Sequence, residues 1–347
     1  MAKRYPFNIA ILSGGPSAEH EISLLSAREV VKNLDPQKYN ALPIIISKDG
    51  KTWLPVSKEK FLESKNGQKS IVVNKTPTNT NVHALKALTD QNGEIDICFI
   101  SLHGPFGEDG TIQSILEFLG IPYTGSGPLA SALGMDKIQS MRLFSQAGLN
   151  TPKNVILNKN ENPSYIWKEL SLPVVVKPNN QGSSLGISIV HKKNGLLDAI
   201  RKARKFSRTI IVEEYIKGTE ITCGVIGNDN PKPLPLVEIV PKNEFFDYQA
   251  KYTPGATDEI APARISKELT KKAQETALKA YRTLGCRGFG RVDMIIKRKR
   301  IYILEVNTIP GLTPISLLPK AAQAAGILFP RLLDKIIKLA LSKDKLS

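Results

Sequence analysis

Cysteine and histidine are both scarce in this chain of 347 residues, which has three of the first and four of the second. The cysteines, Cys98, Cys223 and Cys286, are odd in number and widely spaced, and each lies in an apolar stretch. This pattern argues against a disulfide framework or a thiolate zinc site, and it predicts buried cysteines that pack as small apolar side chains. The histidines also lack the spacing of metal ligands.

Long apolar runs are missing as well. The longest, such as Val174 to Val176, are far too short to span a bilayer, and the segment from Met1 to Phe7 has no signal-peptide core. We therefore expect a cytoplasmic protein with no membrane partner. A hydrophobic fraction of 41% and a charged fraction of 23% are ordinary for a globular protein, and the length suffices for two or three domains.

Aromatic residues make up only 6% of the chain, although its net charge is +16. Such a basic balance raises the question of a nucleic-acid partner. The lysines and arginines are spread over the chain, however, and the densest stretches do not interleave aromatics as a strand-binding surface would. We expect no nucleic-acid partner, and we interpret the charge as a solvated exterior that attracts anionic substrates.

Strands alternate with helices in the first 124 residues, a pattern that predicts a parallel sheet covered on both faces. Ser17 is the expected cap of the first helix, and residues 48–93 are polar and weakly patterned. The expected elements are strands at 7–12, 42–47 and 96–102 and helices at 17–34 and 111–119.

The rest of the chain divides into two α+β regions near residue 214. We expect domains at 1–124, 125–214 and 215–347. The middle region is predicted to hold helices at 129–147 and 195–205 and strands at 174–177, 186–190 and 209–214. The last is predicted to hold strands at 220–226, 234–240, 289–296 and 301–306, a loop at 241–260, and helices at 266–284 and 329–341.

The hairpin near the C-terminus has the most distinctive polar pattern. Alternation along a strand places Arg291 and Asp293 on one face of its first strand, and Glu305 and Asn307 on one face of its second. A turn centred near Lys299 sets Asp293 opposite Glu305, where two carboxylates would repel. An all-oxygen set of this kind suits Mg²⁺ or Mn²⁺ bound with substrate phosphates. A solvated polar face on an edge hairpin is the alternative.

Two further segments could bind a nucleotide. The loop that follows Lys177 carries glycines and serines that can present N–H groups and hydroxyls to phosphate, although a hairpin turn explains it equally well. The strand containing Glu213 precedes Ile216 and the acidic turn at Glu220, which can contact adenine and ribose. An ordinary strand end is the alternative for this segment.

The segment from Ser101 to Gly110 follows a predicted parallel strand, where open α/β sheets collect ligands. Its Glu108 and Asp109 could simply cap the next helix, and His103 could be an ordinary loop histidine. Glu19 has a similar alternative, as a favourable charge at a helix N-terminus.

Taken together, these segments resemble the D-alanine–D-alanine ligases of the ATP-grasp superfamily. The motifs occur in family order with family-like spacing over nearly the whole chain. They are Gly14 to Leu24, His103 to Gly110, Met135 to Lys137, Lys177 to Gly186, Asp247 to Tyr252, Gly290 to Asp293, and Glu305 to Gly311.

The resemblance implies an ATP-grasp fold preceded by a parallel-sheet domain. It also implies an enzyme that uses ATP and Mg²⁺ (or Mn²⁺), as two ions, to join two D-alanines for peptidoglycan precursor synthesis. The carboxylate of the first D-alanine would become an acylphosphate, which the amine of the second attacks. A homodimer is expected by analogy.

The resemblance also implies roles for individual residues. Metal ligands would be Asp293, Glu305 and Asn307. ATP phosphates would be bound by Lys137 and Lys177, and the adenosine by Glu213, Ile216 and Glu220, with Lys251 a further nucleotide contact. Glu19, Ser183 and Tyr252 would bind the first D-alanine and close the loop 243–260. Arg291 and the N–H of Gly311 would stabilise the negative charge that develops at the reacting carbonyl. Ser316 and Leu317 would contact the carboxylate of the second D-alanine, and His103 would be a further substrate contact.

Three rival hypotheses remain at this point. A depsipeptide-forming relative is one, although relatives that use D-lactate commonly carry a different residue at Tyr252. D-serine also remains open as a second substrate. A regulator that binds nucleotide without catalysis is another rival, and the intact set of charged site residues argues against it. A basic nucleic-acid binder is the third, and it would show steeply salt-dependent association.

Overall fold

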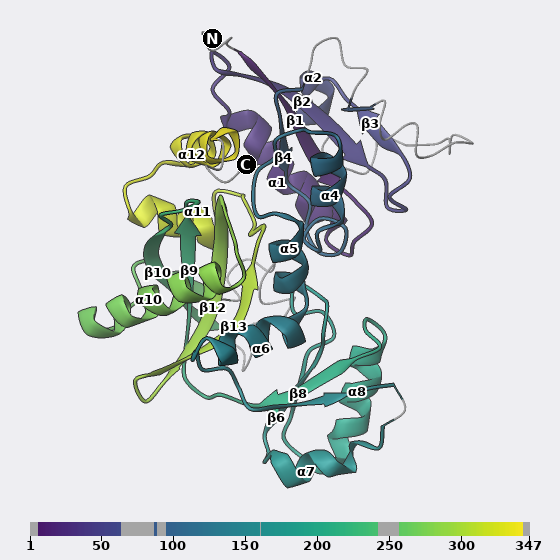
Figure 1. The fold of residues 1–347 in the computed structure, drawn as a ribbon, viewed down its shortest axis with the longest axis vertical. Coiled ribbons are helices and arrows are strands. Elements are labelled where there is room, and N and C mark those ends of the chain that lie inside the picture. The colour runs from purple at the N-terminus through teal and green to yellow at the C-terminus, as the bar shows by residue number, and fades with distance from the viewer. Residues whose placement is uncertain (1–5, 64–86, 89–94, 160, 242–256, 343–347) are drawn as a thin grey trace.

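The computed structural model describes residues 6–63, 87–88, 95–159, 161–241 and 257–342. Three sheets organise this part of the chain (Figure 1). The parallel-sheet domain followed by two mixed α+β bodies confirms the predicted fold class. The three cysteines are buried and free, as predicted. None of the helices in the described ranges is long and apolar enough to cross a membrane.

The N-terminal sheet has the strand order β3-β2-β1-β4. β1 runs parallel to β2 and β4, and the short β3 is antiparallel. Its core is apolar because β1 and β4 are buried on both faces. The elements of this part are β1 (Phe7–Gly14), α1 (His20–Asn33), β2 (Tyr39–Ile46), β3 (Trp53–Pro55), α2 (Lys58–Glu63), β4 (Ile97–Ile100) and α4 (Thr111–Phe118).

The first helix starts later than predicted, and Ser17 does not cap it. α1 begins at His20 after Glu19, and no side chain caps it. The Ser17 hydroxyl instead donates to the His103 carbonyl oxygen at 2.7 Å. The Ser17 hydroxyl oxygen also accepts the Glu19 N–H at 3.1 Å. The prediction failed because Ser17 stands three residues before the helix, in the turn that leads into it.

The middle sheet is antiparallel, in the order β5-β8-β6-β7, and two helices cover it. β5 was not predicted. The elements are β5 (Asn154–Leu157), α7 (Ile166–Glu169), β6 (Val174–Pro178), β7 (Ser188–Val190), α8 (Leu196–Arg204) and β8 (Ile210–Glu214), with short 3₁₀ turns at Pro163–Tyr165 and Lys193–Gly195.

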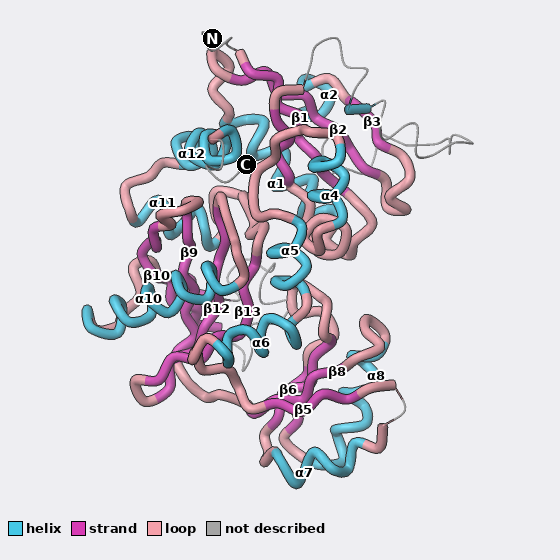
Figure 2. The backbone as a smooth tube through the Cα atoms, viewed as in Figure 1, coloured by secondary structure: helices cyan, strands magenta, loops and turns pink. Residues whose placement is uncertain are grey.

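The helix predicted at 129–147 is two helices, and Figure 2 shows the break between them. α5 (Pro128–Met135) and α6 (Lys137–Gln146) are separated by Asp136, whose backbone is extended and not helical. The Asp136 carboxylate accepts the Gln139 N–H at 3.0 Å and so caps α6. Apolar periodicity continues through the break, which is why the sequence pattern hides it.

The C-terminal sheet has the order β11-β10-β9-β12-β13. Part of the loop predicted at 241–260 is the strand β11, and residues 242–256 lie outside the described residues. α10 packs on this sheet, and α12 crosses back onto the N-terminal core (Figure 1). The elements are β9 (Thr219–Ile226), β10 (Lys232–Pro241), β11 (Thr257–Ile260), α10 (Lys267–Thr283), β12 (Phe289–Lys297), β13 (Arg300–Asn307), α11 (Leu317–Ala324) and α12 (Phe329–Leu341).

The predicted hairpin register is confirmed, although the turn that produces it differs from the one assumed. Asp293 pairs with Glu305 and Arg291 with Asn307. The turn, however, is a two-residue one with positive φ at Arg298 and Lys299, and an irregularity after Asp293 shifts the register by one residue. The turn and the irregularity each move the pairing by one residue, in opposite senses. The pairing of Asp293 with Glu305 is therefore the one predicted.

Candidate active site

A cavity of about 470 Å³ lies where the N-terminal domain, the loop after β6 and the C-terminal sheet meet. The fold gathers there side chains from positions far apart in the sequence. The predicted site residues that line it are Glu19, His103, Lys137, Ser183, Arg291, Glu305, Asn307, Gly311, Ser316 and Leu317.

The paired carboxylates Asp293 and Glu305 each have a cationic partner. Arg291 donates through Nε and Nη2 to the two oxygens of Asp293, each at 2.8 Å. The Thr222 hydroxyl adds a third bond to Asp293, at 2.6 Å, and Lys137 Nζ lies 3.0 Å from Glu305 Oε2. The carboxylates face each other as predicted, and the protein's own cations offset their repulsion.

Burial alone would lower the pKa of the Arg291 guanidinium, but the Asp293 carboxylate beside it raises that pKa above its ordinary value. Arg291 is therefore a fixed positive charge on the cavity wall. The Asp293 and Glu305 side chains remain 11% and 24% exposed. Glu305 lines the cavity, whereas Asp293 is buried next to it.

Glu19 and the loop after β6 meet on the opposite wall. The Ser183 hydroxyl donates to Glu19 Oε1, and a Cβ on Gly182 would come within 2.9 Å of the other Glu19 oxygen. Lys137 Nζ also donates to the Gln181 carbonyl oxygen at 2.7 Å. The Ser183–Glu19 bond joins this loop to the N-terminal domain, and the Lys137–Gln181 bond joins it to α6. The predicted contact of Glu19 and Ser183 with the first D-alanine stays a prediction.

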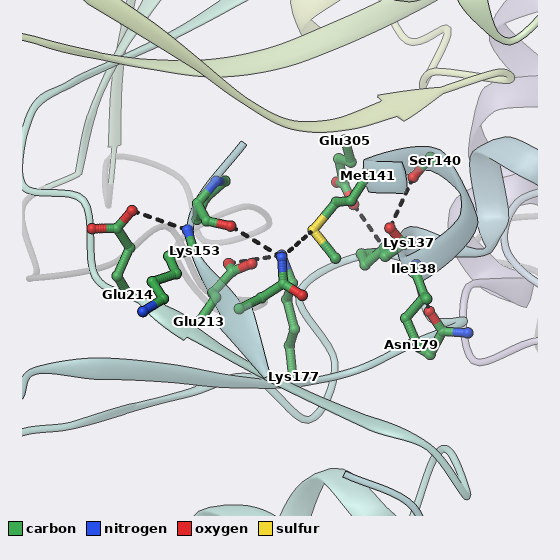
Figure 3. Close-up of polar contacts among 12 residues, drawn as sticks. Lys137, Ile138, Ser140, Met141, Lys153, Lys177, Asn179, Glu213, Glu214 and Glu305 are labelled. Carbon is green, nitrogen blue, oxygen red and sulfur yellow. Dashed lines mark hydrogen bonds and ion pairs between the residues drawn. The ribbon is translucent and has the colours of Figure 1, made fainter. Parts of the chain in front are cut away.

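The family resemblance implied that Lys177, at the end of a buried strand, binds ATP phosphate. The structure gives it a protein partner instead: its Nζ lies 2.7 Å from Glu213 Oε1, and both side chains are buried (Figure 3). The other Glu213 oxygen, Oε2, is buried and has no hydrogen-bond partner among the described residues. An unpaired buried acceptor is costly, so a ligand donor at this position would be favourable.

Some predicted residues do not line the cavity. Lys177, Glu213, Ile216 and Glu220 lie on or next to β6, β8 and β9, and Asp293 lies between Arg291 and Thr222. Ile216 is buried. Lys251 and Tyr252 lie outside the described residues, so their predicted roles stay predictions.

The second-substrate residues lie at the start of α11. Ser316 precedes that helix, and its hydroxyl is 2.7 Å from that of Thr313 rather than capping the helix. Lys320, one turn further on, pairs with Glu259 on β11. Leu317 adds an apolar side chain, so this wall combines helix N–H groups, hydroxyls and one cation.

His103 and Glu108 lie side by side and are buried. His103 bonds Ser26 and Ile309, and burial lowers its pKa. Glu108 accepts the N–H groups of Gly104 and Ile309. Burial, with the neighbouring Glu19 carboxylate, raises the pKa of Glu108 to about 8.

Two polar neighbours of the site were not foreseen. Glu108 was a candidate helix cap, but it accepts the N–H groups of Gly104 and Ile309. The Asp109 carboxylate instead accepts the first N–H of α4, from Thr111, at 3.0 Å. Thr222 was not singled out at all. It pairs with Asp293 in the β9–β12 register, and a known strand order would have revealed it.

Within the described residues, no group of three or more His, Cys, Asp or Glu side chains could hold a metal ion. The predicted set of Asp293, Glu305 and Asn307 contains only two carboxylates. It is an all-oxygen set at one end of a hairpin, of the type that binds Mg²⁺ together with phosphates. The residues present therefore fit the metal that the resemblance implies.

Family models cover both halves of the chain. The model described as "D-ala D-ala ligase N-terminus" matches residues 8–126, and the one described as "D-ala D-ala ligase C-terminus" matches residues 143–338. A D-alanine--D-alanine ligase of Syntrophobacter fumaroxidans is 45% identical over 96% of this chain and 97% of its own.

Solved structures agree with the family models. The D-Ala:D-Ser ligase VanG of Enterococcus faecalis has a TM-score of 0.82 at 37% identity, and the match covers 97% of this chain and 100% of that one. The Bacillus anthracis D-alanine--D-alanine ligase complexed with ATP has a TM-score of 0.77 at 34% identity, covering 96% and 97%. Together with the cavity described above, these matches show that the chain belongs to the D-alanine–D-alanine ligase family of ATP-grasp enzymes.

Proposed function

We propose that this protein joins two D-alanines into a dipeptide, with conversion of ATP to ADP and phosphate, as a step of peptidoglycan precursor synthesis. The observation that carries the proposal is the cavity itself. One wall holds the Glu305 carboxylate with Lys137 and Arg291, and Arg291 is paired with the Asp293 carboxylate behind it. Another wall holds Glu19 and Ser183. The first wall suits a metal–triphosphate and the second an amino acid's ammonium.

ATP is proposed to bind between the middle and C-terminal sheets. Lys137 and Lys177 would neutralise phosphate charge, which supplies much of the catalysis of phosphoryl transfer. Glu213, Ile216 and Glu220 would contact the adenosine. The buried, unpaired Oε2 of Glu213 supports this assignment, because an amino or hydroxyl donor of the nucleotide would satisfy it.

Asp293, Glu305 and Asn307 would hold Mg²⁺ or Mn²⁺, as two ions. The metal, when bound, supplies positive charge that neutralises the phosphate oxygens. Arg291 and Lys137 now pair with two of these ligands. On substrate binding they would lie next to the phosphates and the reacting carboxylate.

The first D-alanine is proposed to bind through its ammonium to Glu19, with Ser183 and Tyr252 completing the contacts. Its carboxylate would attack the γ-phosphorus, and the bond to the bridging oxygen of ATP would break, which gives an acylphosphate and ADP. The amine of the second D-alanine then attacks the carbonyl carbon, and phosphate leaves. Arg291 and the Gly311 N–H would stabilise the oxyanion, and a closed cavity would keep water from the acylphosphate.

The second D-alanine is proposed to place its carboxylate at Ser316 and the start of α11, with Leu317 and His103 close by. D-serine is the main competitor for this site, because one of the structural relatives is a D-Ala:D-Ser ligase. We further propose that the enzyme is a cytoplasmic homodimer.

A substrate panel tests the proposal. Purified enzyme is given ATP, Mg²⁺ and D-alanine, alone or with D-serine or D-lactate, over a pH series, and phosphate and products are measured. The expected result is D-alanyl-D-alanine as the main product, with phosphate released in equal amount. Absence of both products would contradict the proposal, and dominance of the D-serine product would change its second substrate.

A further inference from the structure

Both backbone polar groups of Ile309 are held by side chains from the N-terminal domain. His103 Nδ1 lies 3.1 Å from the Ile309 carbonyl oxygen, and the Ile309 N–H donates to Glu108 Oε1 at 3.3 Å. Because a carbonyl oxygen can only accept, His103 must carry its proton on Nδ1. His103 and Glu108, from one loop, thus bind both backbone polar groups of Ile309, which is distant in the sequence.

The two gripping side chains are themselves fixed. His103 Nε2 lies 3.1 Å from the Ser26 hydroxyl on α1, and in the neutral ring it accepts that proton. Glu108 Oε2 accepts the Gly104 N–H at 2.6 Å. His103, Glu108 and Ile309 are 5%, 6% and 1% exposed. His103 therefore has no free ring nitrogen to offer a substrate.

Ile309 lies midway between two proposed catalytic groups, the amide of Asn307 and the N–H of Gly311. Its N–H also donates to Asn307 Oδ1, at 3.0 Å. The grip on Ile309 therefore sets where the short 307–311 loop stands on the cavity wall. A displacement of about 1 Å at such groups can cost about a hundredfold in rate.

We propose that His103 and Glu108 are positioning residues, which clamp Ile309 and thereby place Asn307 and the Gly311 N–H for reaction. This inference rests on the proposed ligase function. It changes the role of His103 from a substrate contact to a support, and it gives Glu108 a role that its capping motif does not suggest. The N-terminal domain would thus help to build the catalytic loop of the C-terminal domain.

Matched variants separate a clamp from a substrate contact. His103→Asn keeps an N–H close to the Nδ1 position, whereas His103→Gln loses it and keeps one near Nε2. Glu108→Gln keeps one acceptor, whereas Glu108→Met removes both. Tyr39→Phe is the control, since it removes a 2.6 Å bond to Asp334, which joins the same domain to α12 away from the cavity.

Steady-state kinetics give the first readout. We expect His103→Gln and Glu108→Met to lower kcat by about ten- to a hundredfold with KM for D-alanine within about twofold. His103→Asn and Glu108→Gln should recover much of the loss, and Tyr39→Phe should keep wild-type kcat. A rise in KM at unchanged kcat, or equal activity of His103→Asn and His103→Gln, would overturn the clamp.

Hydrogen exchange of the peptide covering residues 308–312 gives a readout that needs no activity. Exchange should be faster in His103→Gln and Glu108→Met than in the wild type, and unchanged in Tyr39→Phe. Unchanged exchange in the first two would also overturn the clamp. If the wild-type enzyme forms no dipeptide, the proposed function fails, and the exchange result still decides whether the clamp exists.

Discussion

Asp293 is held by three hydrogen bonds from Arg291 and Thr222, and this changes the expected effect of its replacement. Sequence alone predicts that Asp293→Asn relieves a repulsion and leaves folding intact or improved. The structure predicts the opposite, because the buried Arg291 loses its counter-charge. We expect Asp293→Asn to lower the free energy of unfolding by about 1–3 kcal/mol, as well as to abolish phosphoryl transfer.

Urea unfolding checks this prediction, with Glu305→Gln as the matched control. Glu305 is more exposed, and its partner Lys137 keeps a second bond to the Gln181 carbonyl. Glu305→Gln should therefore lower the free energy of unfolding by less than Asp293→Asn does. A larger loss of stability in Glu305→Gln than in Asp293→Asn would contradict the assignment of the charges.

Glu108 predicts a pH dependence of stability. Its pKa is raised by burial from the usual 4.5 to about 8, so the native state binds more protons than the unfolded chain between these values. The contribution of Glu108 to the free energy of unfolding must then fall as pH rises through this window and level off above it. The variant Glu108→Gln has no carboxyl group to titrate at this position. The free energy of unfolding of the wild type minus that of the variant should therefore decline as pH rises. A difference that stays constant from about pH 5 to about pH 9 would contradict the shift.

At the scale of single elements, the turn of the β12–β13 hairpin carries strain. Arg298 and Lys299 have φ values of +48° and +64°, a conformation that favours asparagine and glycine in two-residue hairpin turns. Arg298→Asn with Lys299→Gly should raise the free energy of unfolding by about 1 kcal/mol. Activity should not change, because Asn307 lies at the other end of the hairpin.

Thermal and urea unfolding measure the effect of that double substitution. Lys297→Gly is the control, since Lys297 is a strand residue, and glycine there should lower stability by about 0.5–1 kcal/mol. The turn is not strained if the double variant and Lys297→Gly both raise the free energy of unfolding, or if neither does.

The elements also show what sequence can predict. α12 has the bounds that its amphipathic pattern predicted, because one apolar stripe specifies it. The break between α5 and α6 was not predicted, because it depends on the Asp136 cap and not on the apolar periodicity. Ten of the site residues from the motifs line one cavity. Thr222 and Glu108 were missed, because their roles depend on strand order and on the docking of distant loops.

At the scale of the whole molecule, the C-terminal helix completes the N-terminal core. Leu332, Leu333, Ile336 and Ile337 of α12 are fully buried in the same cluster as the residues of β1 and β4. Ile336→Ala should cost about 2–5 kcal/mol of stability, with KM unchanged because the helix is remote from the cavity. Lys335→Ala, on the exposed face, should cost little. Equal stability of the two variants would contradict this packing.

The central claim is that the cavity activates the first D-alanine's carboxylate by phosphorylation. Transfer of ¹⁸O tests it most directly: D-alanine with both carboxylate oxygens labelled is converted with ATP, and the released phosphate is analysed by mass spectrometry. The proposed acylphosphate route predicts one labelled oxygen in each phosphate, because the bridging oxygen leaves with phosphorus. Unlabelled phosphate accompanied by dipeptide would contradict the account.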